Sequence, residues 1–167
     1  MVYFAIAMAL YSEGSYEDVF SKLTDGLSWT SGWAESWSLH SKPGIFQARA
    51  RLGSEPMREL FARVAHPLAT AEMPGSWLAG RRLVAIDGTT LDVADTAENA
   101  VQFGRPGVSK GEQAAFPQAR LVALAECGTH AMFDAVVGTY AISEIELAKV
   151  LVERLSEGML LLADRGF

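Results

Sequence analysis

Hydrophobic residues follow one spacing in the first half of the chain and another in the second half. Up to about residue 70, apolar residues recur three or four positions apart, which is the period of a helix with one buried face. From residue 81 they form short continuous runs, which are typical of buried strands. We therefore expect helices over Val2–Tyr11, from Ser15 onward, over Ile45–Leu52 after a turn at Pro43-Gly44, and from Ser54 with Leu68 on its apolar face.

The second half combines strands with one clear helix. A capping box at Ser143 opens this helix, and its predicted apolar stripe is formed by Leu147, Val150, Leu151 and Leu155. Gly158 stops the helix, and the apolar run Met159–Ala163 follows as a strand. Residues 94–117 are polar and interrupted by glycine and proline, which predicts a long surface excursion. The other strands are expected at Leu83–Ile86, Arg120–Glu126 and Ala131–Gly138, the last two joined as a hairpin.

Two aspartates follow two of the predicted strands. Asp87 closes the run Leu83–Ile86, and Asp164 closes the run that begins at Met159. The last strand is reached through a helical crossover, which requires a parallel partner strand. If the first strand is that partner, the two carboxylates lie side by side at one sheet edge, where open sheets bind their ligands. Two carboxylates on neighbouring strands would form half of a Mg²⁺ site for phosphoryl chemistry.

These elements indicate a mixed α+β protein in two parts. We expect residues 1–80 to form an N-terminal helical domain and residues 81–167 to form a mixed sheet in the order β-β-β-α-β. The apolar stretch Val2–Tyr11 is about half the ~20 residues that a membrane span needs, so a buried helix without membrane association is expected. The short helices joined at Gly53-Ser54 are compatible with a helix-turn-helix. Core packing is expected of Trp29, Trp33 and Trp37, which are spaced four apart.

Composition and charge limit the classes of function. The chain has 167 residues, one cysteine and a formal net charge of −6, which argues against a disulfide framework and against a general polyanion-binding surface. Residues 42–63 nevertheless carry five basic residues against two acidic ones. Such a stripe can bind DNA phosphate, and the alternative is a solvated helix face. The expected DNA contacts are Lys42, Arg49, Arg51 and Arg58, with Arg105 and Lys110 from the 94–117 excursion.

Several short stretches of sequence carry a family resemblance. The second half contains, in order, Ala85-Ile86-Asp87-Gly88-Thr89, Pro117-Gln118-Ala119-Arg120-Leu121-Val122 and Leu161-Leu162-Ala163-Asp164-Arg165-Gly166-Phe167. The helical half adds Val2-Tyr3-Phe4, Gln47-Ala48-Arg49-Ala50-Arg51-Leu52-Gly53 and Leu60-Phe61. Together they resemble the insertion-element-four family of bacterial transposases over nearly the whole chain. The stretches around Asp87 and Asp164 are the most specific.

The resemblance implies a DDE transposase with a ribonuclease-H-like catalytic core, of which residues 81–167 would be an incomplete part. Such an enzyme cleaves DNA and transfers the strands of an insertion element with Mg²⁺, for which Mn²⁺ is the alternative ion. Asp87 matches the first aspartate of the Asp, Asp, Glu triad, and Asp164 matches the second. The resemblance further implies double-stranded DNA as partner, at the element ends and at the target. It also implies a homodimer of the full-length form and a bacterial, cytoplasmic, nucleoid-associated location.

The third member of the triad has no counterpart at the matching positions. In the family this glutamate lies in a later segment, near a Tyr, Arg, Lys signature, and neither Glu144 nor Glu157 matches its motif position. We therefore expect a chain that is cut at both ends and inactive alone.

Other classes of function remain open from the sequence. One is a non-enzymatic DNA-binding fragment of a truncated element, and another is a soluble domain without a nucleic-acid role. The pattern Gly107-Val108-Ser109-Lys110-Gly111 formally fits the nucleophile elbow of α/β-hydrolases. It lacks the required strand before it and helix after it, and no histidine follows His130.

Overall fold

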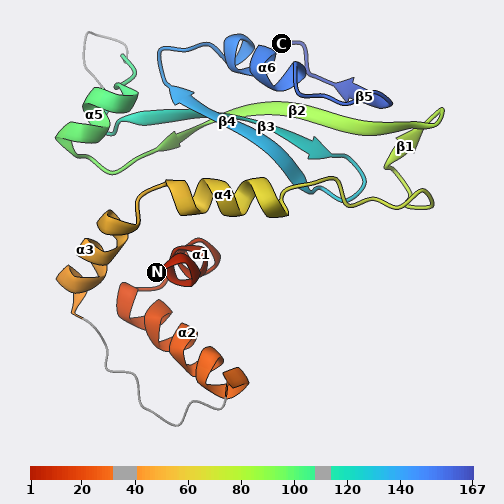
Figure 1. Ribbon diagram of the computed structural model, residues 1–167. Coiled ribbons are helices and arrows are strands. Elements are labelled where there is room, and N and C mark those ends of the chain that lie inside the picture. Colours follow the sequence, from red (N-terminus) through yellow and green to blue (C-terminus); the bar gives the residue numbers. More distant parts are fainter. Residues whose placement is uncertain (32–40, 108–113) are drawn as a thin grey trace. The chain divides into compact units, whose positions relative to one another are not determined.

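The computed structural model describes residues 1–31, 41–107 and 114–167 (Figure 1). These residues form two compact units, Met1–Arg63 and Val64–Phe167. The first unit is helical and the second is built around a sheet, so the mixed α+β class is confirmed. The prediction of a domain boundary at residue 80 stays a prediction. The expected packing of the side chains of Trp29, Trp33 and Trp37 lies outside the described residues.

The helical unit buries a small aromatic and aliphatic core. Phe4 of the first helix lies edge-on to Tyr16, with 5.8 Å between the ring centroids, and also contacts Phe20. Ile45 of the third helix closes this core from a distant part of the sequence. The helices are α1 (Val2–Leu10), α2 (Tyr16–Ser31), α3 (Lys42–Leu52) and α4 (Glu55–Val64), of which the last ends at the boundary between the units.

Two expectations about the helical unit are wrong in detail. Pro43 and Gly44 do not form a turn, because α3 begins at Lys42 and includes both residues in its first turn. Proline is tolerated there since the first helical N–H groups have no intrahelical partner. Leu68 lies beyond the end of α4 at Val64 and is not part of its apolar face, because the chain leaves the helix before His66-Pro67.

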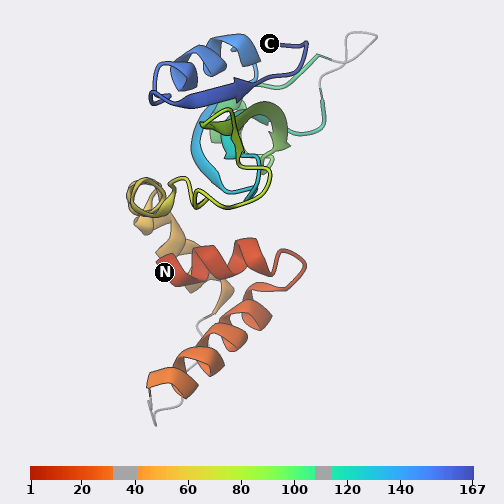
Figure 2. The same cartoon turned by 90° about the vertical axis from the view of Figure 1, so that its right-hand side faces the viewer.

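The second unit contains a five-stranded sheet (Figure 2). The long strand β2 pairs antiparallel with β3 and parallel with β5, and β4 pairs antiparallel with β3. The predicted parallel pairing of the first and last strands is therefore confirmed. The predicted hairpin is confirmed as β3 and β4. The strands are β1 (Trp77–Leu78), β2 (Arg81–Asp92), β3 (Gln118–Glu126), β4 (Met132–Thr139) and β5 (Met159–Leu162).

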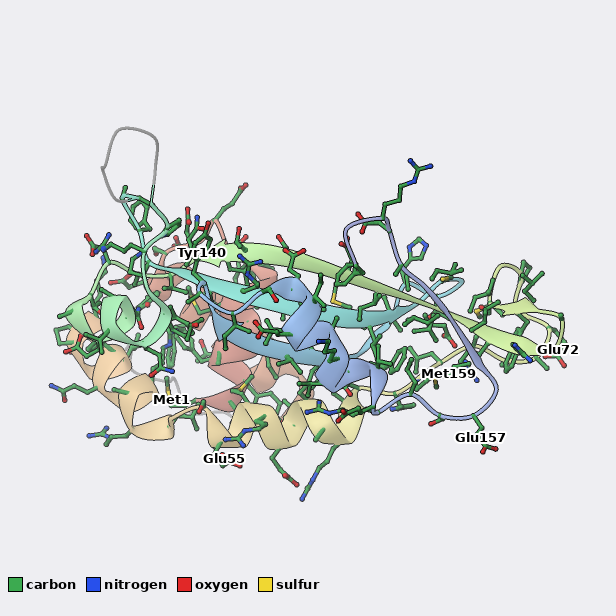
Figure 3. All side chains as sticks on the ribbon, turned by 90° about the horizontal axis from the view of Figure 1, so that it is seen from above. Met1, Glu55, Glu72, Tyr140, Glu157 and Met159 are labelled. Carbon is green, nitrogen blue, oxygen red and sulfur yellow. The ribbon has the colours of Figure 1, made fainter. Side chains whose placement is uncertain are left out.

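One helix covers one face of this sheet. Helix α6 (Glu144–Val152) begins at the predicted capping box, in which the Ser143 hydroxyl accepts from the Glu146 N–H and the Glu146 carboxylate accepts from the Ser143 N–H. The segment between Tyr140 and Met159 carries this helix across the sheet from β4 to β5 (Figure 3). The core between helix and sheet is formed by Val84, Ile86, Val122, Leu124, Leu147, Ala148 and Leu151.

Helix α6 differs from its prediction in two respects. It ends at Val152, before Gly158, which instead adopts a positive φ of 81° in the turn that leads into β5. Ala148 is buried beside Leu147 and Leu151, whereas Val150 is largely exposed.

The predicted surface excursion 94–117 contains a short helix that was not expected from the sequence. Helix α5 (Ala97–Phe103) is capped by the Thr96 hydroxyl, which accepts a hydrogen bond from the Asn99 N–H. Thr96 favours the start of a helix because its side chain satisfies an otherwise unpaired N–H group. The Gln118 N–H then bonds the Gly104 carbonyl, and this bond brings the chain back to the start of β3.

Candidate functional site

Asp87 lies inside a strand and not at its end, which corrects the sequence-based expectation. The stretch after it was expected to leave the sheet, but β2 continues to Asp92. The cause is β3, which pairs with β2 without interruption from Val84↔Glu126 to Asp92↔Gln118. On the other side, β5 stops at Leu162, opposite Ala85. Asp87 is therefore the second residue of β2 beyond its last pair with β5.

Asp164 occupies the equivalent position after β5. The last residue pair between the two parallel strands is Ala85↔Leu162, and Asp164 follows Leu162 by two residues, as Asp87 follows Ala85. The two aspartates thus share one place in the register of two neighbouring parallel strands. The structure brings them to the same end of this strand pair, as expected from the crossover.

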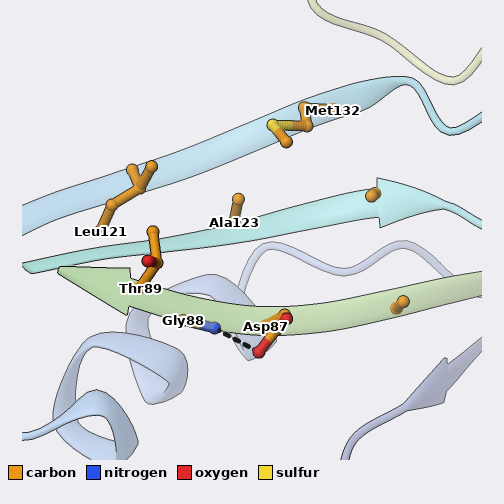
Figure 4. Close-up of a pocket in the computed structure, with 8 residues that line it drawn as sticks. Asp87, Gly88, Thr89, Leu121, Ala123 and Met132 are labelled. Carbon is orange, nitrogen blue, oxygen red and sulfur yellow. Dashed lines mark hydrogen bonds between the residues drawn. The ribbon is translucent and has the colours of Figure 1, made fainter. Parts of the chain in front are cut away.

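Both carboxylates are exposed, and one oxygen of each is held by a backbone N–H group. The Asp87 Oδ1 accepts from the Gly88 N–H at 2.8 Å (Figure 4), and the Asp164 Oδ1 accepts from the Gly166 N–H at 2.6 Å. No hydrogen bond to the second oxygen of either carboxylate occurs among the described residues. Each side chain can therefore offer an oxygen to a ligand without losing its backbone contact.

A shallow hollow lies beside Asp87 on the sheet face opposite α6. Its volume is about 150 Å³, and its walls are mostly small or apolar (Figure 4). Val84 and Ile86 point toward α6, so the residues between and after them point the other way. The hollow is lined by Ala85, Asp87, Gly88, Thr89, Leu121, Ala123, Ala125 and Met132.

The donor set suits a hard divalent cation but is incomplete as a metal centre. Carboxylate oxygens are the ligands that Mg²⁺ prefers, and it keeps several waters when few protein ligands are present. Among the described residues, no group of three or more His, Cys, Asp or Glu side chains is placed to hold a metal ion. A cation held by Asp87 and Asp164 would therefore need water or another carboxylate to complete its coordination.

Glu144 and Glu157 lie in very different places relative to Asp87. Glu157 is exposed in the turn before β5, at the end of that strand opposite to Asp164 (Figure 3). Glu144, the first residue of α6, packs against the backbone of Gly88: a Cβ added to this glycine would lie 2.9 Å from the Glu144 carboxyl carbon. Arg120 pairs with the same carboxylate at 3.7 Å. The contact between Glu144 and Gly88 was not predicted from the sequence. The one sequence feature that could have indicated it is the glycine directly after Asp87, because a residue without a side chain allows such a close approach.

Of the basic residues in the helical unit that were expected to bind DNA, some form ion pairs or hydrogen bonds within the described part of the protein and one does not. Lys42 pairs with Glu17 at 3.3 Å, Arg49 donates to the Tyr16 hydroxyl at 2.5 Å, and Arg58 forms an ion pair with Glu55. Arg51 is exposed, and its side chain has no ion pair or hydrogen bond with any residue that the structure describes.

Arg105 has partners within its own loop. Its guanidinium pairs with Asp95 and donates to the carbonyl of Ala114 at 3.2 Å, so it joins the two ends of the excursion. Lys110, the other basic residue expected there, lies outside the described residues. So does Ser109 of the hydrolase-like pattern.

A buried ion pair at the C-terminal end of β3 was not expected from the sequence. Glu126 is fully buried and pairs with Arg82 of β2. Its carboxylate also accepts from the N–H groups of Leu68 and Ala69 and from the Thr129 hydroxyl. Arg82 in turn lies over the Trp77 ring, 4.5 Å from its centroid. This network fixes the segment before β1 to the hairpin end and lies away from the aspartates.

None of the helices within the described residues is both long and apolar enough to cross a membrane. The expected buried helix Val2–Tyr11 is confirmed as α1, with Phe4 and Ala7 in the core.

Comparison with known proteins identifies relatives of this chain. Residues 1–62 match the family model "Insertion element 4 transposase N-terminal". The chain is 37% identical over 123 residues to the transposase InsG for insertion sequence element IS4 of Escherichia coli K12, an alignment that covers 74% of this chain and 27% of the relative. It is 32% identical over 131 residues to the putative transposase InsZ of the same organism, over 78% of this chain and 44% of the relative.

The chain therefore spans less than half the length of either relative. No solved structure matches it. The similarity extends well beyond the N-terminal family model, since both alignments cover about three quarters of the chain. The family model and the two alignments together identify the chain as a member of the insertion-element-four transposases.

Proposed function

We propose that this chain belongs to a DDE transposase that cleaves DNA and transfers its strands, and that Asp87 and Asp164 hold the catalytic Mg²⁺. The observation that carries the proposal is their equivalent position, two residues beyond the last pair of β2 and β5. The strand order β2, β3, β4, then α6 and β5, is the β-β-β-α-β order expected for the first part of a ribonuclease-H-like core. The names of the relatives support transposition as the process.

The residues of this chain would orient the metal ligands. The Gly88 and Gly166 N–H groups each hold one carboxylate oxygen, so the other oxygen would be available to a cation. A bound Mg²⁺ would activate the attacking water or hydroxyl and stabilise the leaving oxygen of a phosphodiester. Positioning accounts for much of the rate of such reactions, so the two hydrogen bonds matter because they restrict the carboxylates.

The proposed activity needs a third carboxylate. The triad of the family includes a glutamate, and Glu144 and Glu157 do not match its motif position. With two carboxylates a cation can bind loosely through water, but a second ion is not fixed. We infer that residues 1–167 alone neither cleave nor join DNA with Mg²⁺ or Mn²⁺.

The helical unit is the proposed site of DNA phosphate binding. Arg51 lies exposed in the last turn of α3, and Arg49 in the same turn is held by Tyr16. Double-stranded DNA is the proposed partner, in the cytoplasm and at the nucleoid, with a homodimer as the form of the full-length protein.

A DNA cleavage assay tests the proposed activity. Residues 1–167, and a longer polypeptide that adds the matching glutamate, are incubated with a plasmid carrying the ends of the element and with Mg²⁺ or Mn²⁺. We expect cleavage and joining only by the longer polypeptide, and loss of both on Asp87→Asn. Metal-dependent strand transfer by residues 1–167, abolished by Asp164→Asn, would place the third carboxylate within these residues or in a partner subunit.

The second candidate function is non-enzymatic DNA binding by the basic residues alone. The exposed Arg51 favours it, because phosphate binding by this residue needs no metal ion. DNA binding that is unchanged by Asp87→Asn, together with no cleavage by the longer polypeptide, would support this alternative.

A further inference from the structure

Arg165 lies next to the proposed metal ligand Asp164 and has no partner of opposite charge within the described part of the chain. It is exposed, and its side chain forms no ion pair or hydrogen bond with any residue that the structure describes. This is unusual within the second unit, Val64–Phe167, which contains six arginines. Four of them pair with an acidic residue: Arg82 with Glu126, Arg105 with Asp95, Arg120 with Glu144 and Arg154 with Asp134.

The turn that carries Arg165 is held on both sides. On one side, the Asp164 carboxylate accepts from the Gly166 N–H at 2.6 Å, and a Cβ on Gly166 would lie only 3.0 Å from the same oxygen. On the other side, Phe167 packs against the core between α6 and the sheet. The backbone of Arg165 thus lies between a closed turn and a partly buried ring. The hydrogen bond to Gly166 holds one Asp164 oxygen, and the Arg165 guanidinium pairs with neither oxygen of this carboxylate in the structure.

We propose that Arg165 binds a phosphate of the DNA strand beside the Asp87 and Asp164 carboxylates. A guanidinium presents several N–H donors in one plane and binds phosphate in a bidentate manner, and it keeps its charge at every relevant pH. Two carboxylates repel a phosphodiester, and a fixed positive charge beside them offsets part of this repulsion. The location of the bound phosphate rests on the proposed function, whereas phosphate binding by Arg165 can be tested independently of it.

The experiment compares Arg165 with a matched exposed arginine. Arg81 lies at the opposite end of β2, is exposed, and also has no partner of opposite charge among the described residues. Binding of a short fluorescein-labelled DNA duplex is measured by anisotropy over a range of salt concentrations. The proteins are the unmodified chain and the variants Arg165→Ala, Arg165→Lys and Arg81→Ala. Thermal unfolding of each variant controls for folding.

We expect Arg165→Ala to weaken DNA binding about tenfold, since a hydrogen bond to a charged group contributes that much or more. The slope of log affinity against log salt should fall by about one unit, because one phosphate contact is lost. Arg165→Lys should keep the slope, and Arg81→Ala should leave both quantities unchanged. Equal affinities and slopes for Arg165→Ala and the unmodified chain, with folding intact, would overturn the proposal, as would equal losses in Arg165→Ala and Arg81→Ala.

A second measurement separates this proposal from the proposed function. Mn²⁺ binding without DNA is measured for Arg165→Ala, Asp87→Asn and Asp164→Asn. Loss of Mn²⁺ affinity in the two aspartate variants, but not in Arg165→Ala, is the expected result. Unchanged Mn²⁺ affinity in both aspartate variants would contradict the metal site alone, and the DNA measurements would still decide the role of Arg165.

Discussion

Asp87 and Asp164 stand at equivalent positions of two parallel strands, each two residues beyond the last pair, Ala85↔Leu162. This relationship follows from the crossover through α6, which returns the chain to β2 in the parallel direction. Strand β5 stops at Leu162, whereas β2 continues to Asp92. Asp87 and Asp164 therefore lie where the sheet edge changes from β5 to β2. Backbone donors at Gly88 and Gly166 then restrain each carboxylate. Two carboxylates that are far apart in the chain are thereby brought to the same end of one strand pair.

The buried pair of Arg82 and Glu126 should contribute strongly to the stability of the second unit. Replacing Arg82 by Met leaves the Glu126 carboxylate buried without its counter-charge, although three donors remain. Breaking such a pair costs about 3–5 kcal/mol. We expect a loss of unfolding free energy in this range by urea denaturation. Arg81→Met, at the exposed neighbouring position, is the control and should change stability by less than about 0.5 kcal/mol. Equal stabilities of the two variants would contradict the role of the pair.

Gly128 should not tolerate a side chain. A Cβ at this position would lie 2.9 Å from the Pro74 carbonyl oxygen and from the Ser76 nitrogen, which are backbone atoms and cannot move aside easily. Gly128→Ala should destabilise the protein by about 1–3 kcal/mol or more, as overpacked sites do. Gly107→Ala is the control, because no atom of the described residues lies within 4 Å of its added Cβ. A Gly128→Ala variant with the unfolding midpoint of the Gly107→Ala variant would show that the hairpin turn is looser than described.

The capping box of α6 should make stability depend on acid pH. Hydrogen bonds from the Ser143 N–H and hydroxyl lower the pKa of Glu146 below its usual value. A carboxyl group with a lowered pKa in the folded state stabilises the protein above the pKa of the unfolded state, about 4.3 for glutamate, and this contribution is lost as the pH falls through the folded-state value.

The variant Glu146→Gln isolates this charge, because glutamine can keep the geometry of a capping box. We expect the unmodified chain to be more stable than Glu146→Gln at neutral pH, and the difference to shrink below about pH 4. Thermal unfolding across this pH range measures it. A stability difference that stays constant with pH would mean that the Glu146 charge is not involved.

Arg51 should contribute to DNA binding through phosphate contact. Arg51→Ala removes an exposed charge without breaking an ion pair, so the fold should be unaffected. Binding to all sequences should weaken alike, and the salt slope should fall by about one unit. Arg63→Ala, which removes a charge already paired with Glu59 at 2.8 Å, is the comparison and should have the smaller effect. If Arg51→Ala binds DNA with unchanged affinity, the basic residues of this stripe are a solvated helix face and do not bind phosphate.

Local patterns in the sequence predicted much of this fold. The capping box at Ser143, the hairpin turn before His130 and the apolar run from Met159 each identified an element from a few neighbouring residues. The parallel pairing of β2 with β5 also followed, because a helix-length connection can return a strand only in that way. The first three features depend on residues that are close together in the sequence, and the strand pairing depends on the length of the connection.

Features that depend on distant partners could not be predicted in this way. The stretch after Asp87 contains glycine and threonines and does not look like a strand interior, yet pairing with β3 keeps it extended to Asp92. Glu126 is the last residue of a predicted strand, but nothing near it in the sequence indicates its buried contacts with Arg82 and with the Ala69 N–H. Such contacts are set by the packing of the whole unit.

The most direct test of the account is the affinity of residues 1–167 for Mn²⁺, measured by electron paramagnetic resonance without DNA. We predict weak binding of Mn²⁺ that Mg²⁺ displaces, and a loss of about tenfold, or about 1.4 kcal/mol, in each of Asp87→Asn and Asp164→Asn. The control Asp92→Asn, at the far end of β2, should bind as the unmodified chain does. Equal Mn²⁺ affinity in all four proteins would contradict the claim that Asp87 and Asp164 form one metal site.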